Sequence, residues 1–456
     1  MNSFKRQTLS LCMIVKNEEK FLDECLKSVR NVVDQMVIVD TGSSDRTIEI
    51  ARNYGAEVYK YQWRDDFAAA RNESIKYAAG DWILWMDADE RLKPDSIPEL
   101  QKLLRKEEKP VAYVIQIWNR INQGKNYRLS GAHRLFTNHF GITFQGRIHE
   151  QIVYSLAALK GKEHSCTVGL EHLGYDLDET AQDKKHIRNL KLLQRLIKDE
   201  PGNAYAHFSL GQEYAIGKDW EKAVKHFNIA RKKNNFEIGM QAALLNTLGE
   251  ALMNLNRTDE AEKASHLSIR KVRRQVGAYY LLYRIAAKKK NDLLTLDRLE
   301  TLFSMNEEVA EHGKRLSSDV VIDPDMIISE IIKIGQRLDQ PEIIVRWFHR
   351  FSTEKREQRP NQLIFLHHLL KSGKIKEAEQ VIEQSDYSGE AEFLDLAGFI
   401  YIKQRKFEKA IEAYRHLLVF KPENPTLIKR LAGLYAKTGD LEKAQMLLTQ
   451  LVSPAT

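Results

Sequence analysis

Two aspartates, Asp87 and Asp89, stand one residue apart directly after the apolar run Trp82–Met86. Such a run is typical of a buried strand in a parallel sheet, and open α/β sheets bind ligands at the carboxyl ends of their strands. Two carboxylates on a tight turn can hold a divalent cation against a diphosphate. Because most carboxylates in a long chain are only solvated, this triplet needs support from its surroundings before it indicates a metal site.

The chain before this pair alternates between strand and helix patterns. The strands that we expect span residues 9–15, 36–39, 56–61 and 81–86. Repeated βαβ units predict an α/β domain with a doubly wound, mostly parallel sheet. Polar residues follow three of these strands, at 16–18, 40–43 and 87–89, so one edge of the sheet would carry all of them. This convergence favours a metal and phosphate site over a chance triplet.

The pattern changes from strands to helices further along the chain. Four segments after Asp89 favour strands, at residues 111–118, 134–136, 142–153 and 166–175. The rest is nearly uninterrupted helix, in which the aligned alanines Ala378, Ala410 and Ala444 are spaced by 32 and 34 residues. A period near 34 residues with a small residue in each helix indicates tetratricopeptide repeats. Residues 205–230 fit that pattern best, and residues 285–360 hardly fit it.

Helical pairs of this kind stack into a solenoid whose concave face commonly binds peptides or protein segments. A scaffold or dimerisation module without a peptide ligand is an equally frequent use of such repeats, and pairing of solenoid ends would give a homodimer through the repeat domain. We therefore expect an α/β domain over residues 1–178, a linker helix over 179–202 and an all-α tetratricopeptide-like solenoid over 203–456.

Composition narrows the class of protein. The 456 residues allow two or three domains, and 43% hydrophobic with 29% charged residues is typical of a globular protein. The charge of +7 comes from 70 basic and 63 acidic residues mixed along the chain, which argues against nucleic acid as a partner. Cys12, Cys25 and Cys166 lack the spacing of a zinc or disulfide framework, so we expect reduced thiols and a cytoplasmic location. No apolar run reaches the roughly 20 residues that span a bilayer.

Several motifs together resemble a known family. The four motifs in the first part of the chain are residues 14–19, 39–47, 66–72 and 85–90. On these motifs, residues 9–175 resemble the family 2 inverting glycosyltransferases, which have a GT-A fold. A later block, residues 144–150 followed by 172–175, resembles the subgroup that adds helical repeats after the transferase. That subgroup includes the sublancin-type S-glycosyltransferases, which attach a sugar to a bacteriocin cysteine.

The resemblance assigns the donor site to six residues. Those that would border the nucleoside are Val15, Asn17 and Glu18. Asp40 would contact the uracil or ribose through its carboxylate, and Asp87 would contact the ribose. Arg71 would bind phosphate, for which a planar cation with several donors is suited. The alternative for Arg71 is a salt bridge on a surface helix, although the small residues before it leave room for a ligand.

The resemblance also implies a metal and a general base. Asp89 would hold Mn²⁺ or Mg²⁺ against the diphosphate, and His172 would complete the metal site, unless it is a core histidine. Inversion by direct displacement needs one base to take the acceptor proton, and Glu150 is our choice. His149 is the alternative base, or it orients Glu150 and the phosphates. A cysteine acceptor would lower the demand on the base, because a thiolate forms easily and is strongly nucleophilic.

Two departures from the family pattern limit what the resemblance implies. Many members have a second acidic residue after the first strand-end aspartate, where this chain has Thr41, so selectivity for the base stays open. The processive synthases carry Gln-x-x-Arg-Trp, whereas Ile343 stands at the glutamine position before Arg346 and Trp347 here. A single-sugar transfer is therefore favoured over polymer extension.

The expected function is transfer of one sugar from a nucleotide donor, with a UDP-sugar favoured, to a peptide or protein side chain docked with help from the repeats. One alternative keeps the enzyme but makes the acceptor a lipid-linked or cell-surface glycan. Another is a repeat-based interaction protein with a silent transferase domain, which the intact Asp87, Asp89, His149 and Glu150 oppose. Neither the sugar nor the acceptor atom follows from the motifs.

Overall fold

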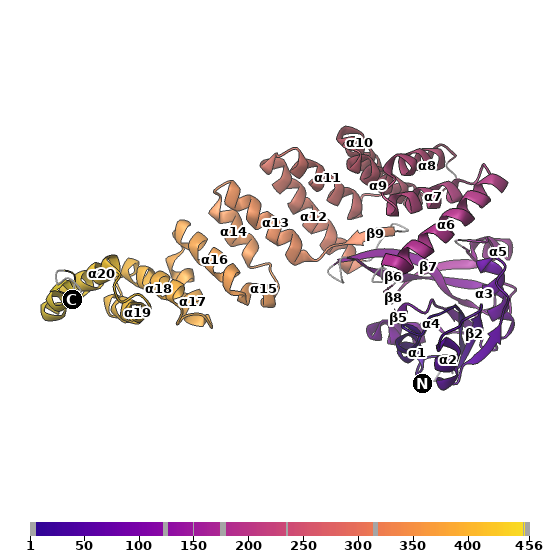
Figure 1. Cartoon of the computed structure of the whole chain (residues 1–456), viewed down its shortest axis with the longest axis horizontal. Helices are drawn as coiled ribbons and strands as arrows, with labels where there is room; N and C mark the ends of the chain where they lie inside the picture. The colour runs from indigo at the N-terminus through magenta and orange to yellow at the C-terminus, as the bar shows by residue number, and fades with distance from the viewer. Residues whose placement is uncertain are drawn as a thin grey trace. The chain divides into compact units, whose positions relative to one another are not determined.

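The computed structural model describes residues 6–121, 126–148, 150–173, 179–233, 236–312, 318–449 and 451. The chain divides into two compact units, the first with residues Met1–Lys290 and Thr301–Asp323, the second with residues Asn291–Glu300 and Pro324–Thr456. Figure 1 labels their helices and strands. Within the described ranges, no helix combines the length and the apolar character needed to cross a membrane.

One mixed sheet forms the centre of the first unit. Its first eight strands are β1 (Leu9–Val15), β2 (Gln35–Asp40), β3 (Glu57–Lys60), β4 (Trp82–Trp85), β5 (Glu90–Leu92), β6 (Val111–Ile121), β7 (Asn126–Thr137) and β8 (Lys162–His172). Their spatial order is β3-β2-β1-β4-β7-β6-β8-β5. The first four strands in that order are parallel, whereas β7 is antiparallel to both β4 and β6. The predicted fold class, a GT-A-type α/β sheet followed by helical repeats, is confirmed, and the sheet becomes mixed beyond β4.

Helices cover both faces of the parallel strands, as a doubly wound sheet requires. They are α1 (Leu22–Val29), α2 (Thr47–Asn53), α3 (Phe67–Lys76) and α4 (Ile97–Leu103), with a short 3-10 turn, η1 (Pro94–Ser96). Successive strand side chains point to opposite faces. Leu11 and Met13 of β1 therefore share a buried core with Leu26 of α1, while Cys12 shares another with Ala68 of α3.

The strand register brings the polar strand ends together. Val15 at the end of β1 is level with Asp40 at the end of β2, and Trp85 at the end of β4 is level with Cys12. Because the three strands are parallel, their carboxyl ends meet at one edge of the sheet, which is where such sheets bind ligands. The predicted strands at 9–15, 36–39, 56–61 and 81–86 are present within one or two residues at each end.

The prediction of a strand over residues 142–153 is wrong. The described residues of this segment form a loop with an isolated bridge, Gln145 to Gln151, and the loop leads into the helix α5 (Val153–Ala158). Gly141 and Gly146 have φ angles of +81° and +101°, which end any extended run because L side chains rarely adopt them. The alternating apolar residues that mimic a strand are buried beneath the loop instead, namely Ile142, Phe144, Ile148 and Ile152.

Helices make up most of the remaining chain. In the first unit these begin with α6 (Glu179–Asp199), α7 (Ala204–Ile216), α8 (Trp220–Lys233), α9 (Ile238–Asn254), α10 (Thr258–Lys271) and α11 (Gly277–Lys288), and α12 (Asp292–His312) follows. The second unit continues with α13 (Pro324–Arg337), α14 (Pro341–Phe348), α15 (Thr353–Glu357), α16 (Arg359–Lys371), α17 (Ile375–Gln384), α18 (Ala391–Lys403), α19 (Phe407–Phe420), α20 (Pro425–Lys437) and α21 (Leu441–Thr449). The first of these, α6, falls within the range 179–202, and the predicted division of the chain at this helix stays a prediction.

The small residues of the repeats are required by helix packing. A Cβ atom added at Gly211 of α7 would lie 2.6 Å from the ring of Phe227 in α8. The same substitution at Gly398 of α18 would collide with the ring of Tyr414 in α19. In these two helix pairs an aromatic side chain of the second helix thus occupies the space that a glycine of the first leaves open, as the repeat signature requires.

The sequence predicted that the repeat region is entirely helical. The structure adds one short strand to it. Residues Ser318–Val321 form a ninth strand, β9, which pairs with β7 in antiparallel register, Leu129 opposite Asp319. The buried carboxylate of Asp319 accepts hydrogen bonds of 2.7 Å from the backbone amides of both Val276 and Gly277 at the start of α11. A segment from the repeats therefore extends the sheet and caps a repeat helix. Four residues carry too little periodicity for sequence analysis to find such a strand.

Replacing Asp319 with alanine should destabilise the first unit by about 2 kcal/mol, because a lost helix cap costs ~1 kcal/mol and unpaired buried amides cost ~1–3 kcal/mol. Urea unfolding followed by circular dichroism measures the loss. Hydrogen exchange should show faster exchange at Val276 and Gly277. The matched control is Asp199→Ala, at an exposed position of the same unit, which should change stability by less than ~0.5 kcal/mol. Equal urea midpoints for the two variants would contradict this role of Asp319.

Candidate functional site

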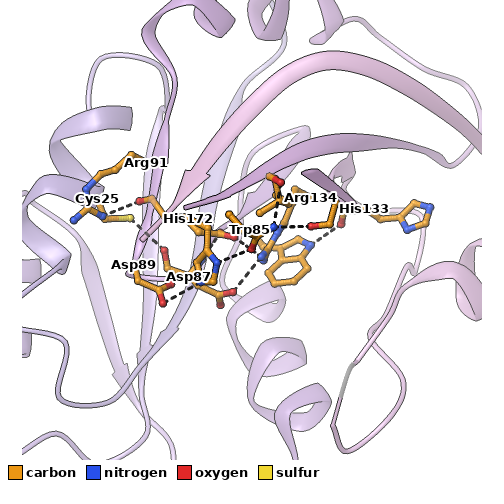
Figure 2. Close-up of polar contacts among 12 residues, drawn as sticks. Cys25, Trp85, Asp87, Asp89, Arg91, His133, Arg134 and His172 are labelled. Atoms are coloured by element: carbon orange, nitrogen blue, oxygen red, sulfur yellow. Dashed lines mark hydrogen bonds and ion pairs between the residues drawn. The ribbon is translucent and has the colours of Figure 1, made fainter. Parts of the chain in front are cut away.

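The Asp87 carboxylate lies between two guanidinium groups. Its Oδ1 atom accepts a hydrogen bond of 2.7 Å from Arg71 Nη2, and its Oδ2 atom accepts one of 3.1 Å from Arg134 Nη2. Arg71 comes from α3 and Arg134 from β7, so elements on both sides of β4 converge on the turn that follows it. Figure 2 shows Asp87 and Arg134 in contact, with Asp89 and His172 beside them.

Each arginine also binds a second carboxylate. Arg71 Nε donates to Glu150 Oε1 at 2.5 Å, and Arg134 Nη2 donates to Glu90 Oε1 at 2.5 Å. The result is an alternating series, Glu150–Arg71–Asp87–Arg134–Glu90, which we call the charge chain. Both arginine side chains are 7% exposed, so the guanidinium ends of these ion pairs are shielded from water, whereas 36% of the Asp87 side chain is exposed.

The indole of Trp85 packs between the two arginines of the charge chain. Its ring centroid lies 4.0 Å from Arg71 Cζ and 3.4 Å from Arg134 Cζ, and its Nε1 atom donates to the carbonyl of His133 at 2.6 Å. Arg134 Nε and Nη1 are buried without a hydrogen-bond partner among the described residues, and stacking on the aromatic face compensates in part for that loss. Trp85 thereby fixes both guanidinium planes, and with them the Asp87 carboxylate.

Local contacts hold the turn that carries Asp87 and Asp89. The Asp87 amide donates to Glu90 Oε2 at 2.8 Å, and Arg91 donates to the carbonyls of Ala88 and Phe21 at 2.9 and 2.7 Å. Figure 2 shows Arg91 and Cys25 on the α1 side of this turn. The carboxylate pair is therefore positioned by both the sheet and the first helix.

Two carboxyl groups of the charge chain, Asp87 and Glu90, have pKa values shifted in opposite directions. Burial opposes ionisation of Asp87, but Arg71 and Arg134 outweigh it and hold the pKa of this carboxyl well below its usual range. Burial raises the pKa of Glu90 to about 7, although Arg134 acts against that rise. Asp87 therefore stays an anion at neutral pH, whereas Glu90 is a carboxyl group that burial pushes towards its neutral form.

Asp89 and His172 form the second feature of the site. His172 Nε2 lies 3.1 Å from Asp89 Oδ2, while His172 Nδ1 lies 2.8 Å from Asn119 Oδ1. The amide nitrogen of Asn119 donates to the Ile117 carbonyl at 3.2 Å and to Ser130 Oγ at 3.0 Å, which fixes its oxygen towards the histidine. Nδ1 must then carry the proton. The Nε2 lone pair of a neutral ring would face a carboxylate, and this arrangement calls for a cation or a second proton.

Asp89 and His172 fit a divalent cation whose remaining coordination positions are filled by oxygens of the substrate. A carboxylate oxygen and an imidazole nitrogen converge, and an outer amide orients the ring, as is usual for metal-binding histidines. In the described part of the chain no group of three or more His, Cys, Asp or Glu side chains converges to hold a metal ion. Two protein groups are enough where phosphate oxygens and water supply the rest, which is how Mg²⁺ is usually bound.

The residues that were predicted to border the nucleoside lie at the carboxyl ends of β1 and β2. The Asp40 carboxylate accepts hydrogen bonds of about 3.1–3.2 Å from the amides of Gly42 and Ser43. Asn17, with a φ angle of +56°, accepts a 2.8 Å hydrogen bond from the Ser44 amide, and the Glu18 amide donates to Thr47 Oγ1 at 2.7 Å. These contacts join the loops after β1 and β2. Part of the bonding capacity of Asn17 and Asp40 is thus used to shape the loops themselves.

The structure brings together Arg71, Asp87 and Glu150 in the charge chain, and Asp89 with His172 beside it. Val15, Asn17, Glu18 and Asp40 lie at the ends of β1 and β2 on the same edge of the sheet. His149, the alternative base, lies outside the described residues. Arg71 is buried, and its Nε and Nη2 atoms bind Glu150 and Asp87, so its contact with phosphate stays a prediction that these ion pairs oppose.

Sequence reasoning missed four residues of this site, Trp85, Glu90, Asn119 and Arg134. Trp85 and Glu90 flank the aspartate pair in the sequence, so their position could have identified them. A charged residue and a large aromatic residue next to a ligand-binding turn are candidates for holding that turn in place. Asn119 and Arg134 lie on long strands with no local motif. Only the pairing of β6, β7 and β8 places them near the turn.

A cavity of about 1830 Å³ opens beside the charge chain within the first unit. Trp85, Phe144 and Glu150 line it on the sheet side. Tyr205 at the start of α7 and Phe236 before α9 line it on the repeat side, so the predicted linker and the first repeats enclose the same space. Tyr205 is also hydrogen-bonded to Gln151, the neighbour of Glu150. The cavity therefore extends from the charge chain to the repeats.

Comparison with known proteins agrees with this geometry. Residues 10–160 match the family described as Glycosyl transferase family 2. The chain carries a family 2 glycosyl transferase domain. Residues 190–238 and 391–424 match two tetratricopeptide repeat families. The predicted combination, a family 2 transferase domain followed by tetratricopeptide repeats, is therefore confirmed.

Proteins similar to part of this chain occur in several bacteria. A TPR repeat-containing protein of Synechococcus elongatus is 38% identical over 209 residues, which cover 44% of this chain and 51% of that protein. The SPbeta prophage-derived glycosyltransferase SunS of Bacillus subtilis is 28% identical over 236 residues, covering 50% and 54%. An uncharacterized glycosyltransferase of Rickettsia typhi is 26% identical over 215 residues, covering 45% and 73%. The match thus spans about half the length of the first two relatives.

Replacing Asp87 with asparagine should destabilise the transferase domain more at pH 7 than at pH 3. The depressed pKa of Asp87 means that its stabilisation is present above its ordinary value and is lost as pH falls below about 4. We expect a loss of about 2 kcal/mol at pH 7, the lower end for a partly buried ion pair, because 36% of the side chain is exposed. Urea unfolding at both pH values, beside Asp199→Asn, measures the difference. A loss that does not change with pH would contradict the ion pairs.

Proposed function

We propose that this protein is a metal-dependent inverting glycosyltransferase that moves a single sugar from a UDP-sugar to a peptide or protein side chain. The observation that carries the proposal is the convergence, at one sheet edge, of the charge chain and the pair of Asp89 with His172. The family 2 domain and the glycosyltransferase relatives support the class of reaction. The proposed identities of the donor and the acceptor are based on the family resemblance and on the geometry of the first unit.

The donor would lie along the ends of β1, β2 and β4. Val15, Asn17, Glu18 and Asp40 would border the nucleoside there, and Asp87 would contact the ribose. A carboxylate held between two guanidinium groups cannot rotate freely, so Asp87 is suited to orient a hydroxyl-bearing ligand. The same ion pairs keep it ionised at neutral pH and therefore able to accept hydrogen bonds.

Asp89 and His172 would hold Mn²⁺ or Mg²⁺. When bound, the cation would neutralise the charge that develops on the departing diphosphate. Asn119 would keep the His172 lone pair directed at that position through its 2.8 Å contact with Nδ1. Asp89 would contribute its carboxylate, and no general acid would be needed on the leaving-group side.

Glu150 would act as the general base, with His149 as the alternative. In the reaction an acceptor atom attacks C1 of the sugar, the bond from C1 to the diphosphate oxygen breaks, and the acceptor proton passes to the Glu150 carboxylate. The products are the glycosylated acceptor with inverted configuration and UDP. Arg71 holds Glu150 Oε1 at 2.5 Å, and Glu150 lines the cavity with 9% of its side chain exposed, so the carboxylate is fixed at the cavity wall.

The cavity beside the charge chain would take the acceptor. It is lined by Glu150 on one side and by Tyr205 and Phe236 of the repeat region on the other. An extended peptide could contact both sides at once, which favours a peptide or protein acceptor docked partly by the repeats. In the second unit, Arg346 and Trp347 both contact Glu300, so this Arg-Trp pair serves helix packing there, which supports transfer of a single sugar.

The state of the cysteines bears on where the protein acts. All three cysteines are unpaired, and burial raises the pKa of Cys12 to about 12 and that of Cys166 to about 11. Inert, reduced thiols are consistent with the cytoplasmic location that we propose. A homodimer through the repeat domain stays a prediction.

The donor and metal assignments predict that release of UDP from a panel of UDP-sugars requires Mn²⁺ or Mg²⁺ and stops with a chelator. Asp89→Ala should lower the rate by about 10²–10³-fold, because a metal ion supplies several kcal/mol of stabilisation to the leaving group. Mass spectrometry of the products measures the release. Asp95→Ala, which changes an exposed carboxylate in the turn η1, is the matched control. Release that continues at full rate in the chelator would exclude the metal, and a lack of release from every donor would exclude the proposed activity.

Two substitutions in the cavity should separate chemistry from acceptor binding. Glu150→Gln should lower kcat by about 10²–10⁴-fold with little change in acceptor KM. Tyr205→Ala should raise acceptor KM about 10-fold with little change in kcat, because a buried aromatic anchor is lost. The measurement is transfer to a peptide panel with a central Cys, Ser or Thr.

The control for these variants is Glu108→Gln, at an exposed position before β6, which should leave both constants unchanged. Full activity of Glu150→Gln would exclude Glu150 as the base. Transfer to a lipid-linked glycan with none to any peptide would replace the peptide acceptor with the alternative one.

A further inference from the structure

Arg188, on the linker helix α6, forms no ion pair with a carboxylate of the described residues. Its Nε and Nη2 atoms donate to the neutral Asn189 Oδ1 at 3.4 and 3.2 Å, and its guanidinium lies 5.1 Å from the ring centroid of Phe67. Among the residues that the structure describes, no carboxylate forms an ion pair with it. The side chain is exposed, so it can meet a ligand from solution.

Packing places Arg188 beside the charge chain. Leu190 and Leu193 of α6 pack against Ile148 and Phe67, which belong to the loop before Glu150 and to the start of α3. The Phe67 amide donates to the Arg147 carbonyl at 2.9 Å, so this loop and α3 are joined where Arg188 stacks. The guanidinium is thus held over a rigid part of the transferase domain.

Two carboxylates of the candidate site act on Arg188 electrostatically. Partial burial lowers the pKa of the guanidinium, and the charges of Glu213, Glu150 and Glu18 oppose that effect. Glu150 ends the charge chain, and Glu18 lies in the loop after β1 that would border the nucleoside. Arg188 is therefore within electrostatic range of both the expected nucleoside loop and the charge chain, and its contact with Phe67 places it at the start of α3.

Arg71 is a poor candidate for the same contact. Its side chain is 7% exposed, its Nε and Nη2 atoms bind Glu150 and Asp87, and its guanidinium stacks against Trp85. Moving it to a phosphate would leave two carboxylates without their partner, which is costly in a shielded site. A diphosphate needs an accessible cation, and a guanidinium matches its oxygens in a two-pronged geometry.

We propose that Arg188 binds the diphosphate of the nucleotide donor, so that the linker helix supplies a residue of the donor site. This inference rests on the proposed function, because it requires a nucleoside diphosphate donor. It makes α6 part of the transferase site as well as the connection to the repeats. Residues 1–178 alone would then lack this diphosphate contact, and donor binding would stabilise α6, the helix that precedes the repeats.

The test compares binding of UDP and of uridine to the full chain in Mn²⁺ by calorimetry. Arg188→Gln should weaken UDP about 10-fold or more and leave uridine unchanged, because only the charged contact is lost. Arg188→Lys should retain most of the UDP affinity. In the wild type, UDP should slow hydrogen exchange in α6, and Arg188→Gln should lose that protection.

Arg195→Gln is the matched control, since it removes an exposed arginine from the same helix and should leave UDP affinity unchanged. Equal UDP affinity of Arg188→Gln and the wild type would overturn the inference while leaving the proposed function intact. Equal weakening of UDP and uridine, with a lower melting temperature, would assign Arg188 a purely structural role and also overturn it. A wild type that binds none of UDP, GDP, ADP and CDP would remove the proposed donor and the inference with it.

Discussion

The double ion pair of Asp87 is the interaction on which the site depends. A carboxylate on the turn after β4 is held by one arginine from α3 and another from β7, and Trp85 keeps both guanidinium planes in place. Each arginine then holds a further carboxylate, so the position of Glu150 in the cavity and the burial of Glu90 both follow from the same network. Each buried charge loses its hydration, and the attraction of the oppositely charged neighbours in the charge chain offsets that desolvation free energy.

The transferase domain and the first repeats form one unit because they share structure. The strand β9, from the repeat region, extends the sheet next to β7, and its Asp319 caps α11. The helix α6 packs on Phe67 and Ile148, and the cavity beside the charge chain is lined by Tyr205 and Phe236 as well as by Glu150. Removing the repeats would thus alter the sheet and the cavity together, so a shortened chain is a poor test of acceptor docking.

Much of the parallel half of the fold was predictable, because βαβ units place a strong period in the sequence. The strands β1 to β4 and the loops after them follow apolar runs that end in polar residues. The loop over residues 142–153 was mistaken for a strand because Ile142, Phe144, Ile148 and Ile152 are buried at even spacing although the backbone is not extended. Arg134 and Asn119 had no local signal, since long antiparallel strands bring them to the turn from distant positions.

The sequence by itself determined which residues end the parallel strands and which helices repeat, because both depend on local spacing along the chain. Asp87, Asp89 and the repeat alanines could be identified on that basis alone. Only the tertiary structure decided which charges pair, since Arg71, Arg134 and Glu150 are far apart in sequence and meet only when α3, β7 and a loop converge. It also placed Arg188 against Phe67 without an ion pair to any described carboxylate, because the helix that carries it is positioned by packing and not by any motif.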